Sequence, residues 1–243
     1  MNKEKLIVDI WEKCFNQHIL ESALTILNST YPNVDKKDFA EMSLGKRNYL
    51  LTRVHENLFG KSLYCVVSCP ECNSQSEFII ATDEITSLNT NEEKRAFAFQ
   101  SDDFKIIYKL PDSYDLASAS KYSEVQSVLN DLLNRCIIKL SHNEQELLAR
   151  DLPEEIVQKL SEEISKNDPC SETLINLSCQ NCKHEWNSVF DIASFLSRSI
   201  NHYAKNILSD IHSLASAYGW NESEILNMTP QKRNWYIEAL GVR

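Results

Sequence analysis

Glycine and proline are scarce in this chain of 243 residues, which has four glycines and six prolines. Isolated glycines cannot form the phosphate-cradling loops of Walker-type or dinucleotide-binding enzymes, so these two enzyme classes are excluded. With so few loop-forming residues, the chain is expected to have short or rigid loops and a largely helical structure.

Long hydrophobic runs are also missing. Charged residues interrupt the N-terminal segment, which argues against a signal peptide there. No stretch approaches the roughly 18 apolar residues that a membrane span needs. We therefore expect no membrane insertion and a cytoplasmic location, where the environment is reducing and disulfides are rare. The eight cysteines then need another explanation.

Basic residues are outnumbered, since 25 lysines and arginines stand against 35 aspartates and glutamates and leave a net charge of −10. Half of this excess lies in residues 141–170, which contain eight acidic and three basic side chains. Such a run is typical of a solvated helical surface, with a site for a basic partner as the alternative. The negative field repels phosphates and disfavours binding to nucleic acids.

Hydrophobic periodicity divides the chain into helical and extended segments. Apolar residues spaced three and four apart predict helices over residues 3–29, 43–59, 125–137, 152–164 and 192–218, with two short helices after the last. Runs of β-branched and aromatic residues predict two hairpins, 62–67 with 77–80 and 174–177 with 185–190. A further strand pair, 96–99 with 104–110, is expected between the hairpins.

Two C-x-x-C motifs stand at the turns of the two hairpins, Cys69 with Cys72 and Cys179 with Cys182. In such a knuckle both sulfurs point to one side of a tight turn. Two knuckles supply four soft ligands in a tetrahedron, which is the environment that structural zinc prefers. The sequence therefore predicts one zinc ion bound by these four cysteines. Because the motifs are unusually far apart, the segment between them must start and end at neighbouring points.

A redox dithiol, two disulfides and inert buried cysteines are the alternative interpretations. A redox pair is normally followed by a helix, which neither motif has, and disulfides do not suit the cytoplasm. Replacement of one ligand by Cys170 or His184 stays open. A site filled by four protein ligands stabilises rather than catalyses. Since no other catalytic motif is present, we expect no enzymatic activity and no small-molecule substrate.

A zinc-ribbon regulator that binds nucleic acid is the main alternative function. Residues 217–226 and 230–240 have helix-turn-helix spacing, and the second of these helices carries Lys232 and Arg233 without a basic stripe. An enzyme that acts through the dithiols comes third.

The tail and the order of the motifs resemble a known family. The segments WNSVFDIASF (186–195), DIHSLASAYGWNESEIL (210–226) and 233–240 follow, in order, a segment from Arg47 to Gly60, the first knuckle, an insertion, Asp168-Pro169 and the second knuckle. This pattern is similar to that of baseplate hub or hub-assembly proteins of contractile phage tails and extracellular contractile injection systems. The likeness spans residues 45–240 and departs from the family at Ser197, where it implies a tryptophan.

The resemblance implies a non-enzymatic structural or assembly protein of a contractile baseplate. Its partners would be baseplate, tail-tube or spike proteins. It would act in the cytoplasm and could enter the assembled particle.

These interpretations together predict an α+β fold, mostly helical, with a small split zinc ribbon. We expect a helical region at 1–60, the ribbon at 61–83 and 171–190, an inserted strand pair with acidic helices at 84–170, and a helical tail at 191–243. Four aromatic residues in the neutral tail are candidates for partner contact: Tyr218, Trp220, Trp235 and Tyr236. The alternative is that these aromatics seal the short helices onto the long one.

Overall fold

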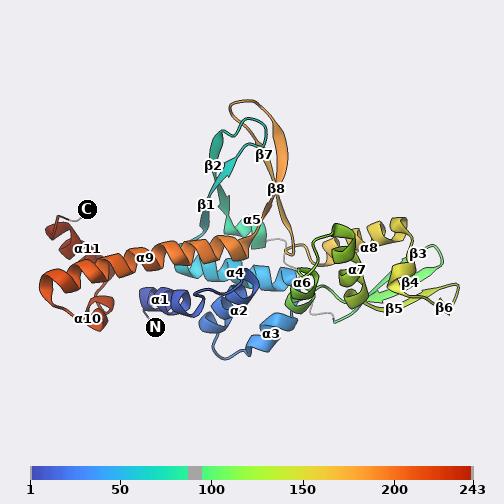
Figure 1. The fold of residues 1–243 in the computed structure, drawn as a ribbon, viewed down its shortest axis with the longest axis horizontal. Coiled ribbons are helices and arrows are strands. Elements are labelled where there is room, and N and C mark those ends of the chain that lie inside the picture. The colour runs from blue at the N-terminus through green and yellow to red at the C-terminus, as the bar shows by residue number, and fades with distance from the viewer. Residues whose placement is uncertain (1, 87–94, 242–243) are drawn as a thin grey trace. The chain divides into compact units, whose positions relative to one another are not determined.

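The computed structural model describes residues 2–86 and 95–241 and has an α+β fold with more helix than strand, as predicted (Figure 1). The chain divides into two compact units. Unit 1 consists of Met1–Asn33 and Ala193–Arg243, and unit 2 consists of Val34–Ile192. No described helix is long and apolar enough to cross a membrane. Residues 87–94 of the predicted insertion lie outside the described residues.

Unit 1 is built from five helices in its described part: α1 (Lys3–Lys13), α2 (Ile19–Thr30), α9 (Ile192–Tyr218), α10 (Glu222–Leu226) and α11 (Pro230–Ala239). The prediction of one helix over residues 3–29 is wrong, because the chain breaks between α1 and α2. Asn16 has a φ of 59°, which interrupts a right-handed helix, and the His18 ring caps α2 by accepting the amide of Leu20.

The helices of the tail begin and end where their local signals predicted. Gly219 follows α9 with a φ of 69°, a conformation that favours glycine. Asn221 and Glu224 form a reciprocal capping box at the start of α10. Thr229 caps α11, whose first residue is Pro230.

A buried ion-pair cluster joins three helices of unit 1. The Arg233 side chain of α11 is only 4% exposed and forms a bidentate pair with Glu4 of α1. Its Nε lies 3.5 Å from Asp210 of α9. Because removal of either acid would leave part of a buried charge unpaired, the cluster fixes these helices to one another.

Unit 2 begins with two helices that lead to the first hairpin. α3 (Lys36–Glu41) is capped by Asp35 and was not predicted. α4 (Leu44–Phe59) starts at the cap Ser43 and ends at Gly60, which has a φ of 96°. The bounds of α4 confirm the prediction for residues 43–59.

The insertion forms a four-stranded antiparallel sheet rather than the isolated strand pair that the sequence predicted. Its order is β3 (Phe97–Ser101), β4 (Phe104–Tyr108), β5 (Ile137–His142) and β6 (Gln145–Glu146). Ile137, predicted as part of a helix, is the first residue of β5. Its apolar side chain continues the spacing of the helix before it, so periodicity alone does not reveal the change.

Two helices of the insertion, α7 (Val125–Cys136) and α8 (Glu154–Asn167), pack against this sheet, and α6 (Ser113–Ala119) packs against α7. A short 3-10 turn lies at Ala149–Asp151. The core of the insertion contains six buried side chains from β4, β5, α7 and α8: Ile106, Tyr108, Leu133, Leu140, Ile156 and Leu160. The acidic helix predicted at 152–164 is α8, which buries Ile156 and Leu160.

Asp168 fastens the end of the insertion to the start of α4. One carboxylate oxygen accepts a hydrogen bond from the Ser43 hydroxyl, and the other accepts one from the Gly45 amide. Both donor–acceptor distances are 2.8 Å. Burial raises the pKa of Asp168, although these two donors and the Arg47 charge favour the ionised form. The Asn48 amide extends the contact by donating to the carbonyls of Cys170 and Ser171.

The close approach of Asp168 to α4 requires glycine at position 45. A Cβ at this position would overlap the Asp168 carboxylate. We expect Gly45→Ala to lower the free energy of unfolding by about 1–3 kcal/mol, because overpacking outweighs the usual gain from alanine in a helix. Chemical denaturation measures this change. Gln158→Ala, at an exposed position of α8, is the control and should unfold like the parent. Equal stability of all three proteins would contradict the packing described here.

Candidate metal centre

Two antiparallel hairpins carry the C-x-x-C motifs, as predicted. The first pairs β1 (Ser62–Ser68) with β2 (Gln75–Ala81), and the second pairs β7 (Thr173–Ser178) with β8 (Glu185–Phe190). Figure 1 shows the two hairpins side by side, standing away from the helices of unit 2. Each knuckle lies at a hairpin turn.

The two knuckles share one backbone geometry. The amide of Cys69 donates to the carbonyl of Ser74, and the amide of Cys179 donates to that of His184, both at 2.9 Å. In each turn the residue after the second cysteine is left-handed, with a φ of 57° at Asn73 and 62° at Lys183. The repeat seen in the sequence is therefore a repeat of local structure.

The four sulfurs converge on one point. The Sγ atoms of Cys69 and Cys182 are 3.6 Å apart, as are those of Cys72 and Cys179, and all four lie within 4.8 Å of one another. An S–S bond is about 2.0 Å long, so these are free thiols. An ion that binds sulfur at about 2.3 Å in a tetrahedron, as zinc does, would need separations of about 3.8 Å. The four sulfurs, which we call the cysteine cluster, fit such an ion.

The surroundings of the cysteine cluster shift the pKa values of two of its thiols in opposite directions. The backbone amide of Cys182 and the Ser74 hydroxyl favour the thiolate of Cys179 and lower its pKa to about 5. The amide of His184 favours the thiolate of Cys182, but desolvation of the sulfur and the neighbouring sulfurs outweigh it and raise that pKa to about 12. Adjacent thiolates repel one another, and a divalent cation between them would remove that repulsion.

Ser74 is a polar neighbour of the cluster that sequence reasoning missed. Its hydroxyl lies 3.1 Å from the sulfurs of both Cys72 and Cys179. The equivalent residue of the second knuckle, His184, stacks its ring on Trp186 instead. Ser74 could have been identified from its spacing, two residues after the second cysteine of the motif. The turn of a C-x-x-C knuckle brings the residue at that spacing back to the sulfurs.

The structure also places the two residues that the sequence left open as ligands. Among the described residues, the group of atoms able to hold a metal contains the four cysteines alone. The buried Cys170 thiol donates to the carbonyl of Ile85 at 3.4 Å, and His184 stacks on Trp186. The Cys170–Ile85 contact also brings the two ends of the insertion together, as the spacing of the motifs required.

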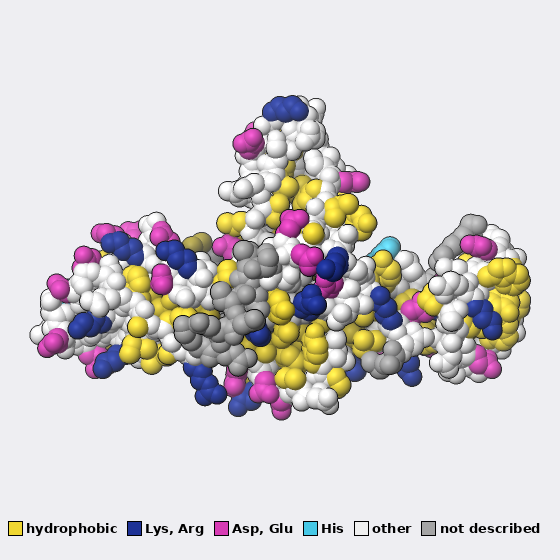
Figure 2. All heavy atoms as spheres, turned by 180° about the vertical axis from the view of Figure 1, so that it is seen from behind, with side chains coloured by type: hydrophobic (Ala, Val, Ile, Leu, Met, Phe, Trp, Pro, Cys, Tyr) yellow, Lys and Arg dark blue, Asp and Glu magenta, His cyan; other side chains and the backbone are white. Residues whose placement is uncertain are grey.

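The outer faces of the hairpins expose large apolar side chains. Tyr64 is paired with Ile79 across the first hairpin, and Leu174 with Val189 across the second. All four are more than half exposed. Tyr64 and Leu174 each lie five residues before the first cysteine of their knuckle, so the two pairs occupy equivalent positions. Figure 2 shows hydrophobic side chains along these projecting hairpins.

The structure brings the four candidate aromatics of the tail together. Tyr218 stacks on Trp220 with ring centroids 4.6 Å apart, and Tyr236 meets the edges of both rings. Trp235 touches Tyr236 edge-on at 5.0 Å and is 63% exposed. Three of the rings thus form a packed cluster, while the indole of Trp235 faces mainly solvent.

The helix that was considered for nucleic-acid binding lacks the basic surface that this role needs. Arg233 of α11 is buried in its pair with Glu4, which leaves Lys232 as the exposed one of the two basic residues. A single exposed cation does not make a phosphate-binding stripe.

Comparison with known proteins identifies one family. A family model described as T4 bacteriophage base plate protein matches residues 2–197. The match includes the whole cysteine cluster and ends within α9, before the four tail aromatics. No curated protein and no solved structure matches the chain.

Proposed function

Because the chain belongs to the family of T4 bacteriophage base plate proteins, we propose that it is a structural or assembly protein of a contractile baseplate. It acts through protein–protein contacts in the cytoplasm and catalyses no reaction. The observation that carries this proposal is the family match over residues 2–197. The apolar side chains exposed on the hairpins support it, because exposed apolar patches are typical of surfaces that bind other proteins.

A single structural zinc ion completes this proposal. Cys69, Cys72, Cys179 and Cys182 supply four sulfur ligands, which is the full coordination number of structural zinc. With no position left for water or substrate, the ion would hold the two hairpins together and would activate nothing. Because the four cysteines would fill every coordination position, the ion is expected to have a structural role.

Loss of one sulfur should release the ion. We expect Cys72→Ser and Cys179→Ser to retain well under half an equivalent of zinc and to melt at lower temperature than the parent. Metal analysis after gel filtration and a thermal melt measure the two effects. Cys65→Ser is the matched control, because it removes a thiol from β1 outside the cluster. Parental zinc content and melting temperature in both knuckle variants would refute the metal site.

Trp235 is the residue through which we expect the tail to contact a baseplate, tail-tube or spike protein. Its exposed indole offers a large area to a partner at a low entropy cost. Tyr218, Trp220 and Tyr236 instead hold the end of α9 and α11 together through their mutual packing. The tail thus combines a structural cluster with one projecting anchor.

The two tryptophans should therefore separate stability from binding. We expect Trp220→Ala to lower the free energy of unfolding of the chain by about 2–4 kcal/mol, as for other packed aromatic side chains. Trp235→Ala should change stability by less than about 0.5 kcal/mol and reduce capture of co-expressed tail proteins about tenfold or more. Thermal melts and a quantitative pull-down measure both.

The parent protein is the reference for this experiment. Full capture by Trp235→Ala would place the partner contact elsewhere on the chain. Failure of the parent to capture any baseplate, tail-tube or spike protein would count against the proposed function itself.

Nucleic-acid affinity should be weak. With a net charge of −10 and Arg233 buried, we expect dissociation constants for duplex DNA and for RNA of about 10⁻⁴ M or weaker at physiological salt. Fluorescence anisotropy over a series of salt concentrations measures them. Submicromolar binding that falls steeply with salt would favour a regulator that binds nucleic acid.

A further inference from the structure

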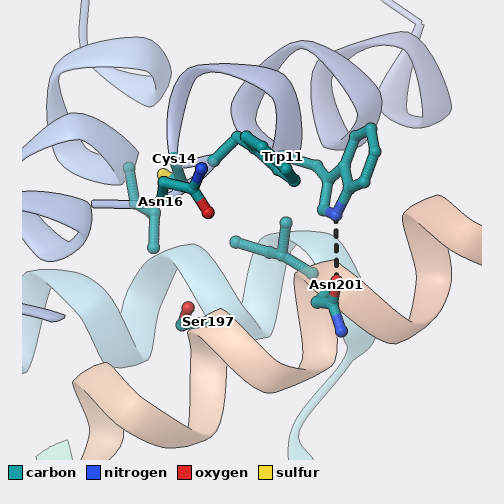
Figure 3. Close-up of a pocket in the computed structure, with 8 residues that line it drawn as sticks. Trp11, Cys14, Asn16, Ser197 and Asn201 are labelled. Atoms are coloured by element: carbon teal, nitrogen blue, oxygen red, sulfur yellow. Dashed lines mark hydrogen bonds between the residues drawn. The ribbon is translucent and has the colours of Figure 1, made fainter. Parts of the chain in front are cut away.

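A cavity of about 180 Å³ opens in unit 1 where α1, α2 and α9 meet. Trp11 of α1, Ile26 of α2, and Ser197 and Asn201 of α9 contribute to its lining. Figure 3 shows the side chains of Trp11, Ser197 and Asn201 around this space, with Cys14 and Asn16 on the segment between α1 and α2. The cavity belongs to neither the cysteine cluster nor the tail aromatics.

The aromatic wall of the cavity is held in place. The Trp11 indole N–H donates to the Asn201 side-chain oxygen at 2.9 Å. The Phe15 ring meets Trp11 edge-on, with centroids 6.2 Å apart and planes at 64°. Phe15 is nevertheless 66% exposed. The rings of Trp11 and Phe15 are therefore already oriented for a molecule that enters the cavity. Such a molecule would also cover the Phe15 ring, which is now largely exposed to water.

The size and charge of the cavity narrow the choice of occupant. An apolar cavity of about 150 Å³ accommodates benzene, so this one has room for a single aromatic ring. None of the residues that line it is charged, although the chain has a net charge of −10. The amides of Asn16 and Asn201 and the hydroxyl of Ser197 provide hydrogen-bonding groups in the lining. An uncharged ring with a polar edge, either an indole or a phenol, fits these features.

We propose that this cavity receives one tryptophan or tyrosine side chain of a partner protein. A free molecule of this size would bind weakly, since few atoms fit inside, whereas a side chain on a protein gains further affinity from contacts around the opening. The nature of the partner rests on the proposed function, in which other baseplate components bind this chain. The choice of an indole or phenol ring rests only on the volume and the lining of the cavity.

Model amides test the ring chemistry without the partner. We expect N-acetyl-tryptophanamide and N-acetyl-tyrosinamide to shift the Trp11 indole N–H resonance saturably, with dissociation constants in the millimolar range. N-acetyl-leucinamide should bind at least tenfold more weakly. Equal affinity for all three amides, or no saturable shift with the aromatic ones, would overturn the proposal.

Filling the cavity tests its location. Ser197→Phe, and the smaller Ser197→Leu in case the first does not fold, should reduce aromatic amide binding tenfold or more and reduce capture of tail proteins. Ser209→Phe, at an exposed position on the same helix, should leave both unchanged. Melting curves establish that each variant is folded.

The two readouts separate this proposal from the proposed function. Undiminished capture of tail proteins by a folded Ser197 variant that no longer binds the amides would overturn the docking proposal and leave the function standing. Failure of the parent to capture tail proteins, together with amide binding that Ser197→Phe abolishes, would count against the baseplate role while supporting the aromatic-binding cavity.

Discussion

Convergence of four sulfur atoms is the constraint on which unit 2 depends. Each hairpin has two strands in the described part of the chain, and an isolated two-stranded hairpin is at best marginally stable in water. The sulfurs belong to turns that are 107 residues apart, counted from Cys72 to Cys179. The metal ion proposed above would cross-link these turns and support both hairpins at once. The convergence of the sulfurs itself fixes where the chain must return after the insertion.

The insertion meets this constraint with polar contacts at its ends. Asp168 accepts hydrogen bonds from the first turn of α4, and Cys170 reaches the carbonyl of Ile85. The insertion has its own core between the four-stranded sheet and its helices, and none of the six buried side chains of that core comes from the hairpins. The second hairpin therefore starts from a fixed point beside the first.

Elements with strong local signals could be predicted from the sequence. Ser43 and Gly60 delimit α4, and the cysteine spacing indicated both hairpin turns and the four clustered sulfurs. Features that depend on distant partners could not be predicted. Nothing near Arg233 reveals that it pairs with Glu4, 229 residues away. The break at Asn16 and the start of β5 at Ile137 were both missed because the apolar spacing of the preceding helix continues across them. Only the pairing of β5 with the distant strand β4 distinguishes it from a further helical turn.

The distance between the two knuckles has a consequence during synthesis. At translation rates of roughly 5 to 20 residues per second, Cys179 follows Cys72 by about 5 to 20 seconds. Throughout that interval Cys69 and Cys72 form a two-sulfur site, which offers a metal ion half of the ligands of the finished cluster. For the zinc site proposed above, all four ligands would be present only after the whole insertion has been made. The nascent chain would then have to keep its first pair of thiols reduced until that point.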